Sequence, residues 1–145
     1  MGVTRSASLP VHLRWDAVGL VALGGAGGTA ARVAISLAIP PVGAIPVATV
    51  AINVAGAFLL GVLLEVLTRR GPDEGRLRSI RLLLGTGFLG GFTTYSALAI
   101  DTVMLTGGDT GTALAYSFGT ILIGGVATWA GIVTGTRLAG RRVAR

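Results

Sequence analysis

The chain of 145 residues is 52% hydrophobic and only 12% charged, with a mean hydropathy of +0.78 and a formal net charge of +6. Soluble domains carry roughly 25% charged residues, so this composition excludes an ordinary soluble domain and indicates a membrane protein with several spans. The sequence contains no cysteine, which excludes disulfides and cysteine-ligated zinc or iron–sulfur sites.

Four apolar segments are each long enough to cross a hydrocarbon core of about 30 Å, and they are predicted as helices over 17–38, 46–67, 79–105 and 112–136. Arg5 and Arg14 precede the first segment as in a signal peptide. Its apolar run exceeds the usual h-region of roughly 7–15 residues, so we expect a retained helix. The connections are short. We therefore predict one all-α membrane domain over 1–145.

Small residues recur at four-residue spacing in three of the spans, a pattern that lets helix backbones approach closely in lipid. The pairs are Gly24 and Gly28, Gly87 and Gly91, and Gly131 and Gly135. We expect a compact bundle from them. Arg32 lies near the outer end of the first span, where an anchor at the membrane interface is its simplest role.

Two spans carry isolated polar side chains. Asn53 lies about 10 Å into the second helix, and its amide requires partners in lipid. It could line an ion pathway or form an interhelical hydrogen bond, and this residue alone does not decide between the two. Tyr116 and Thr120 are one turn apart on the fourth helix and share a face, as packing residues also do.

The third span contains the stretch GFLGGFTTYSA, from Gly87 to Ala97, within an uncharged run. Adjacent glycines weaken a helix, and a break within a bilayer frees backbone groups that protein, water or an ion must satisfy. Freed carbonyls suit a cation, whereas amide and hydroxyl hydrogens suit an anion. We therefore predict a functional break in this stretch. The alternative is a softened, continuous helix whose threonines bond back to their own backbone.

The arginines predict the orientation of the chain. Eleven of the twelve fall before the first span, in or beside the connection between the second and third spans, or after the fourth span. With four spans, these regions share one side of the membrane. The positive-inside rule places them, and both termini, in the cytoplasm. This arrangement accounts for the positive charge without nucleic-acid binding.

Three ordered motifs carry a family resemblance. The first span matches GGxxGAxxRY at Gly24, Gly25, Gly28 and Arg32. The second matches GTLxVNxxGxFxxG at Thr49, Asn53, Gly56, Phe58 and Gly61. The third follows GxxGGxTTFSTFSxE from Gly87 to Asp101. The chain thus resembles the CrcB (Fluc) fluoride channels, four-helix membrane proteins that work as antiparallel dimers.

The resemblance implies a passive, fluoride-selective channel of the cell (plasma) membrane, not an enzyme. It implies a structural, untransported Na⁺ held by the carbonyls of Gly90 and Thr93 from both subunits. It also implies structural roles for Arg32 and Gly91. The implied fluoride pathway is lined by Asn53, Thr94, Tyr95, Ser96, Tyr116 and Thr120. Hydrogen-bond donors and ring edges suit fluoride, which only accepts hydrogen bonds. On this basis Asn53→Asp is expected to block transport with less effect on folding.

The sequence also departs from the family pattern. The two third-helix phenylalanines fall on Tyr95 and Leu98, and a threonine and a serine fall on Ala97 and Ala99. The tyrosine of the first motif falls on Val33, and the terminal glutamate is Asp101. An aromatic ring and two hydroxyls are therefore missing from the expected anion pathway.

Two other functions remain open from the sequence. A proton-coupled exporter of small cations requires a midplane acid, but Glu65 and Asp101 lie near opposite ends of their spans. A non-conducting structural subunit of a heterodimeric fluoride channel fits the missing residues. The one-sided arginines favour a heterodimer with a homologous chain of opposite orientation, with a dual-topology homodimer as the competing assembly.

Overall fold

The computed structural model describes residues 14–143, and this part of the chain is helical apart from its connections. Four segments are long and apolar enough to cross a membrane: Trp15–Ala38, Val47–Thr68, Gly75–Thr106 and Thr110–Gly140. The first two are α1 (Trp15–Ala38) and α2 (Val47–Thr68), and the last belongs to α6 (Thr110–Val143). The prediction of an all-α, four-span protein is confirmed, and the chain is a multi-pass membrane protein.

The third span is built from four consecutive elements. These are α3 (Gly75–Ile80), the π-helix η2 (Arg81–Leu89), the short α4 (Gly90–Phe92) and α5 (Tyr95–Thr106). In η2 the hydrogen bonds are of the wider i→i+5 type, and the amide of Gly90 continues this pattern by donating to Gly85 O. The predicted break therefore exists, between α4 and α5, and the π-helix η2 precedes it in the chain.

The predicted bounds agree closely with the observed ones except in two places. The third span begins at Gly75, four residues before the predicted start, because α3 adds a polar turn. The fourth helix ends at Val143, seven residues later than predicted, because it continues through its arginine-rich end. Arg5 and Arg145, which contribute to the predicted charge asymmetry, lie outside the described residues.

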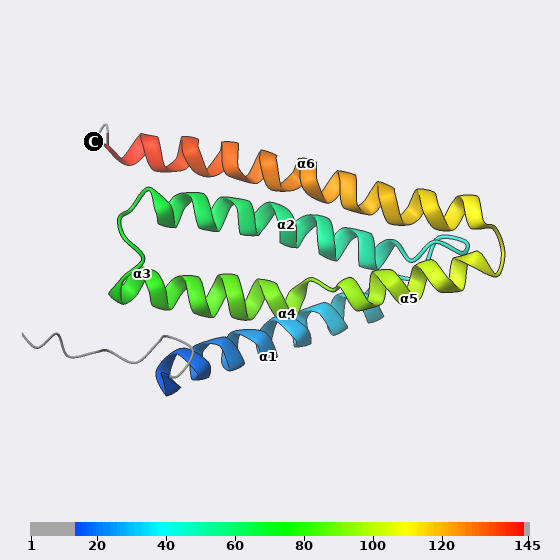
Figure 1. Cartoon of the computed structure of the whole chain (residues 1–145), viewed down its shortest axis with the longest axis horizontal. Helices are drawn as coiled ribbons and strands as arrows, with labels where there is room; N and C mark the ends of the chain where they lie inside the picture. The colour runs from blue at the N-terminus through cyan, green and yellow to red at the C-terminus, as the bar shows by residue number, and fades with distance from the viewer. Residues whose placement is uncertain (1–13, 144–145) are drawn as a thin grey trace, which may run out of the picture.

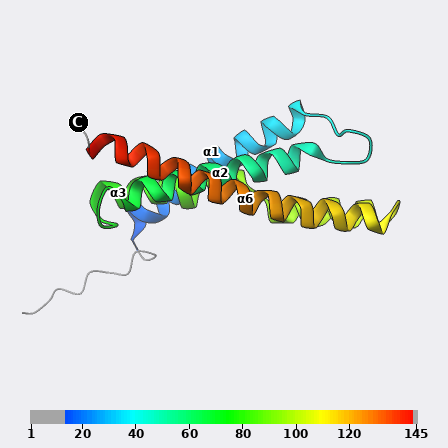
Figure 2. The same ribbon diagram turned by 90° about the horizontal axis from the view of Figure 1, so that it is seen from above.

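The helices lie roughly side by side in the order α6, α2, third span and α1 (Figure 1). Among the helices, α2 packs mainly on α6, α1 packs on η2 and α4, and α5 packs on α6. The start of α1, the α2–α3 connection and the end of α6 lie at one end, so the described arginines other than Arg32 gather there. The α1–α2 and α5–α6 connections lie at the other end in both views (Figure 2).

The glycine pairs form the closest helix contacts. A Cβ atom built on Gly28 would lie 1.9 Å from Phe88 O, and one on Gly24 would lie 2.1 Å from Leu83 O, so α1 packs directly on the backbone of η2. Similarly, a Cβ on Gly131 would lie 2.2 Å from Phe58 O in α2. Side chains larger than hydrogen do not fit at these positions, as expected from the four-residue spacing.

Candidate functional site: the helix break and the groove beside it

The break in the third span lies at Thr93 and Thr94, directly after the glycine pair. Both residues have extended backbone, with φ/ψ of −75°/156° and −148°/119°. Gly90 and Gly91 are themselves helical, in α4. Gly91 serves close packing, because a Cβ there would lie 2.4 Å from Gly25 O of α1. The glycines therefore bring α1 against the break, and the two threonines form it.

Asn53 of α2 replaces the helical hydrogen bonds of Thr94. Its Nδ2 donates to Thr94 O at 2.9 Å, and its Oδ1 accepts from Thr94 N at 2.8 Å. A carboxamide has one donor side and one acceptor side in the same plane, so it pairs with a peptide group much as a neighbouring strand would. Asn53 thus forms the interhelical hydrogen bond considered from the sequence. One Nδ2 hydrogen remains outside this pair.

Two residues of α1 hold the other side of the break. Arg32 Nε donates to Gly91 O at 3.3 Å, and Thr29 Oγ1 donates to the same oxygen at 3.4 Å. In an unbroken helix this carbonyl would accept from the amide of Tyr95. The guanidinium of Arg32 is therefore directed at the break, which differs from the interfacial anchor expected from its position in the sequence.

Two carbonyls at the break lose their helical donors. Thr94 N, the helical partner of Gly90 O, donates to Asn53. Ala97 N, the helical partner of Thr93 O, donates to Thr94 Oγ1 at 3.1 Å, which caps the start of α5. These are the two carbonyls expected to hold Na⁺. Carbonyl oxygens are hard donors, and unwound segments of membrane helices use them for cations of this kind. The donor set therefore fits a sodium ion, although one chain supplies too few oxygens to surround it.

A groove of about 360 Å³ opens beside the break, between α2, the start of α5 and α6. Four of the expected pathway residues line it: Asn53, Thr94, Tyr95 and Thr120. Tyr95 is 79% exposed, and its hydroxyl has no hydrogen-bond partner among the described residues. Leu98, which replaces a family phenylalanine, also lines the groove. The structure thus brings together polar groups from three spans at mid-membrane depth.

Ser96 and Tyr116 do not line this groove. The Ser96 hydroxyl lies 3.2 Å from Thr94 Oγ1 at the exposed start of α5. Tyr116 is only 7% exposed, and its hydroxyl donates to Asp101 Oδ2 at 3.0 Å. The Thr120 hydroxyl donates to Tyr116 O within α6 at 2.7 Å. In this conformation the hydroxyl hydrogens of Tyr116 and Thr120 are therefore engaged within the chain.

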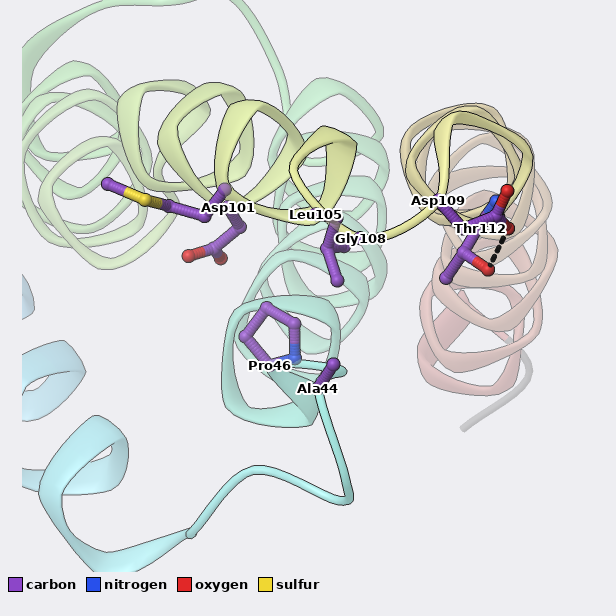
Figure 3. Close-up of a pocket in the computed structure, with 8 residues that line it drawn as sticks. Ala44, Pro46, Asp101, Leu105, Gly108, Asp109 and Thr112 are labelled. Atoms are coloured by element: carbon purple, nitrogen blue, oxygen red, sulfur yellow. Dashed lines mark hydrogen bonds between the residues drawn. The ribbon is translucent and has the colours of Figure 1, made fainter.

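A second cavity, of about 370 Å³, lies at the end opposite the arginines. Figure 3 shows it between the start of α2, the end of α5 and the start of α6, with Asp101 and Asp109 on its walls. Asp109 accepts from the Thr112 hydroxyl and from the amides of Thr112 and Gly111, and these bonds hold the pKa of its carboxyl below the usual value. Asp109 therefore caps α6, whereas Asp101 joins this cavity to Tyr116.

The arginine-rich end is partly neutralised by acidic side chains. Arg81 forms a two-point ion pair with Asp73, at 2.7 and 2.9 Å, and this pair lowers the pKa of Asp73. Arg69 pairs with Glu65, whose carboxylate also accepts from Thr136. These contacts fasten the α2–α3 connection and the end of α6 to the bundle.

Sequence reasoning missed several polar partners. Thr29, which bonds to the break, precedes Arg32 by three positions and shares its helix face, so the spacing could have indicated it. The Thr102–Ser117 hydroxyl pair, at 2.6 Å, joins α5 to α6. Both are ordinary hydroxyls in apolar helices, and only the packing of α5 on α6 identifies them as partners.

The fold and the site together define a small four-helix membrane protein with a broken span, and a polar groove beside the break. The family model described as "CrcB-like protein, Camphor Resistance (CrcB)" matches residues 19–132. The chain belongs to this family.

Known relatives extend the match to nearly the whole chain. The chain is 52% identical over 141 residues, covering 97% of both sequences, to a protein of Leifsonia xyli subsp. xyli named "Fluoride-specific ion channel FluC 2". It is 42% identical over 127 residues to "Fluoride-specific ion channel FluC 1" of Cutibacterium acnes, covering 86% of this chain and 89% of the relative. A third relative, "Fluoride-specific ion channel FluC" of Paracoccus denitrificans, is 40% identical over 120 residues, covering 81% and 93%.

Proposed function

We propose that this chain forms a channel through which fluoride leaves the cytoplasm passively and selectively. The observation that carries the proposal is the 52% identity, over nearly all of both chains, to a relative named as a fluoride-specific ion channel. The mid-membrane groove supports it, because the groove places amide and hydroxyl groups beside a break in a membrane span. The proposed activity is conduction, so no chemical reaction is involved.

The chemistry of the groove suits a small anion that accepts hydrogen bonds. The free Nδ2 hydrogen of Asn53 and the hydroxyls of Thr94 and Tyr95 are available donors at the groove. Such neutral donors replace part of the hydration shell of fluoride without holding it as tightly as a ring of cationic side chains would. Ser96 lies within reach of Thr94 Oγ1 and extends this set of donors. Tyr116 contributes once its hydroxyl leaves Asp101.

The proposal is tested by ion efflux from liposomes that contain this chain together with a homologous partner. Fluoride should leave and chloride should remain, without ATP or a proton gradient. Thr120→Val should slow fluoride efflux, because it removes a groove hydroxyl that we expect to turn from Tyr116 O toward a passing ion. Thr134→Val is the matched control, because that hydroxyl also donates within α6, to Ala130 O, but lies outside the groove. Equal efflux of chloride from the functional assembly would refute the proposed selectivity.

A structural sodium ion belongs to the same proposal. The carbonyls of Gly90 and Thr93 would hold it, together with the same carbonyls of a second chain, and the ion would offset the carbonyl dipoles that the break leaves without donors. Dimer content and fluoride efflux should both fall when sodium is exchanged for a bulky organic cation, which is too large for a site made of these carbonyls. Unchanged dimer content and unchanged fluoride efflux would argue against the ion.

The second chain is proposed to lie antiparallel, and to be a homologous chain that inserts the opposite way. The support is the charge distribution, since the described arginines other than Arg32 lie at one end and the positive-inside rule places that end, with both termini, in the cytoplasm. Single cysteines at the C-terminus and in the connection between the last two spans (residues 106–111) can be labelled from each side of intact cells, because the native chain has none. Equal numbers of copies in each orientation would favour the homodimer.

Efflux measurements also separate a conducting chain from a non-conducting structural subunit. Liposomes with this chain alone and with a homologous partner should be compared at the same protein density. Fluoride efflux through pores that only this chain lines would rule out the non-conducting role. Efflux with the partner that is unchanged when Tyr95→Phe and Thr120→Val are combined in this chain would support it.

A further inference from the structure

A second groove, separate from the polar one, has an entirely apolar lining. It has a volume of about 340 Å³ and lies between α2 and η2, where all the lining residues are leucine, valine or phenylalanine. Leu59, Leu63 and Val66 form the α2 wall, and Leu84 and Phe88 form part of the η2 wall. Leu59 and Leu84 are 47% and 42% exposed, so this groove is open to the surroundings of the helix bundle.

The apolar groove faces away from the polar groove around α2. Ala57 lines the polar groove and Leu59 lines the apolar one, and two positions of an α-helix point about 200° apart. The other walls differ as well, since α5 and α6 complete the polar groove and η2 completes the apolar one. A second chain that covers the polar groups at the break therefore leaves the apolar groove facing lipid.

The apolar groove lies in the half of the bundle nearer the arginine-rich end, and a positive charge lies beyond its α2 wall. Arg70 lies in the turn that directly follows α2, two residues after the helix ends at Thr68, at the arginine-rich end. From Leu59 to the end of α2 at Thr68 the rise is about 14 Å, close to half of a hydrocarbon core of about 30 Å. Arg70 is exposed and forms no ion pair with any side chain that the structure describes, whereas Arg69 pairs with Glu65 and Arg81 with Asp73.

We propose that this groove binds one anionic phospholipid of the leaflet at the arginine-rich end. One acyl chain lies along Leu59, Leu63 and Phe88, and the phosphate lies at Arg70. The apolar walls bind the acyl chain of the lipid but do not discriminate between lipid headgroups. Arg70 adds the preference for an anionic lipid, since a basic residue near the membrane surface attracts anionic lipid by about 1 kcal/mol.

The test places a fluorescent label in the groove and uses brominated lipids as quenchers. Leu59→Cys carries the label. In the control, Leu122→Cys carries it instead, since Leu122 on α6 is 69% exposed and lies outside the groove. Both sites are unique because the native chain has no cysteine. Protein in nanodiscs of unbrominated phosphatidylcholine receives small amounts of either brominated phosphatidylglycerol or brominated phosphatidylcholine.

Phosphatidylglycerol should occupy the site at Leu59 about fivefold more effectively than phosphatidylcholine, which is the fold-change that about 1 kcal/mol represents. At Leu122 the two lipids should quench alike. Arg70→Gln should abolish the preference at Leu59, whereas Arg137→Gln, on α6 at the same end, should leave it intact. Equal quenching by the two lipids at Leu59, or equal effects of the two arginine variants, would overturn the proposal. Cross-linking between Leu59→Cys copies would assign the groove to a second chain instead.

Discussion

Asn53→Ala should destabilise the fold markedly, because one side chain satisfies both backbone groups of Thr94. The substitution removes hydrogen bonds of 2.8 and 2.9 Å and leaves an amide and a carbonyl without partners at mid-membrane depth. Each orphaned buried group costs about 1–3 kcal/mol, so the free energy of unfolding should fall by about 2–6 kcal/mol. The partial exposure of this site places the expected value in the lower half of that range.

The measurement is reversible unfolding in mixed micelles with increasing dodecyl sulfate, followed by circular dichroism. Ser117→Ala is the matched control, because it removes the hydroxyl contact with Thr102 but orphans no backbone group. Its cost should be about 0.6 kcal/mol, the average for interhelical hydrogen bonds in a membrane protein. If Asn53→Ala unfolds no more easily than Ser117→Ala, the pairing with Thr94 does not stabilise the break.

The same geometry changes what is expected of Asn53→Asp. A carboxylate can still accept from Thr94 N, but it has no donor for Thr94 O and would place a negative oxygen against that carbonyl. Folding is therefore no longer expected to be spared, and a loss of fluoride efflux in this variant would not by itself assign Asn53 to the pathway. Efflux must be normalised to the amount of folded protein.

Further predictions concern packing, pH and sodium. Gly28→Ala should destabilise the protein strongly, because the added Cβ would lie 1.9 Å from Phe88 O. Gly119→Ala is the control: its Cβ would have nothing within 4 Å, so it should be neutral or stabilising by up to about 1 kcal/mol. The melting temperatures of the two variants are compared with that of the native protein. The hydrogen bond from Arg81 lowers the pKa of Asp73 in the folded protein. The stability from this pair is therefore present above the pKa of Asp73 in the unfolded chain, about 3.9, and is lost as the pH falls below it. Asp73→Asn should weaken this acid dependence in unfolding experiments. Removing sodium should leave the helical circular dichroism of the single chain unchanged, because Asn53 holds the break without an ion.

The features that depend on periodicity and composition could be predicted from the sequence. The four spans follow from the length of the apolar runs, and the close α1–η2 and α2–α6 contacts follow from glycines at four-residue spacing. The break followed from adjacent glycines and hydroxyls within a span. Its position at Thr93 and Thr94 did not, because the glycines that suggested it are used for packing against Gly25.

The choice of partners depends on tertiary contacts and could not be read from the sequence. Asn53 has the same polar side chain in either of the two roles considered for it, and only the position of Thr94 shows that both ends of the amide are engaged. Tyr116 shares a helix face with Thr120, yet its hydroxyl reaches across to Asp101 on α5. The π-helical winding of η2 has no signal in the residue pattern, since Gly85 and Gly87 are compatible with either helix type.

The contacts at the break divide its freed backbone groups into two sets. Asn53 satisfies Thr94, and Thr29 and Arg32 satisfy Gly91 O, so one chain alone can maintain the break. The carbonyls of Gly90 and Thr93 lose their helical donors and gain no side-chain donor among the described residues. An uncompensated carbonyl in hydrocarbon costs several kcal/mol. A cation and a second chain would remove this cost together, which gives assembly a driving force located at the break itself.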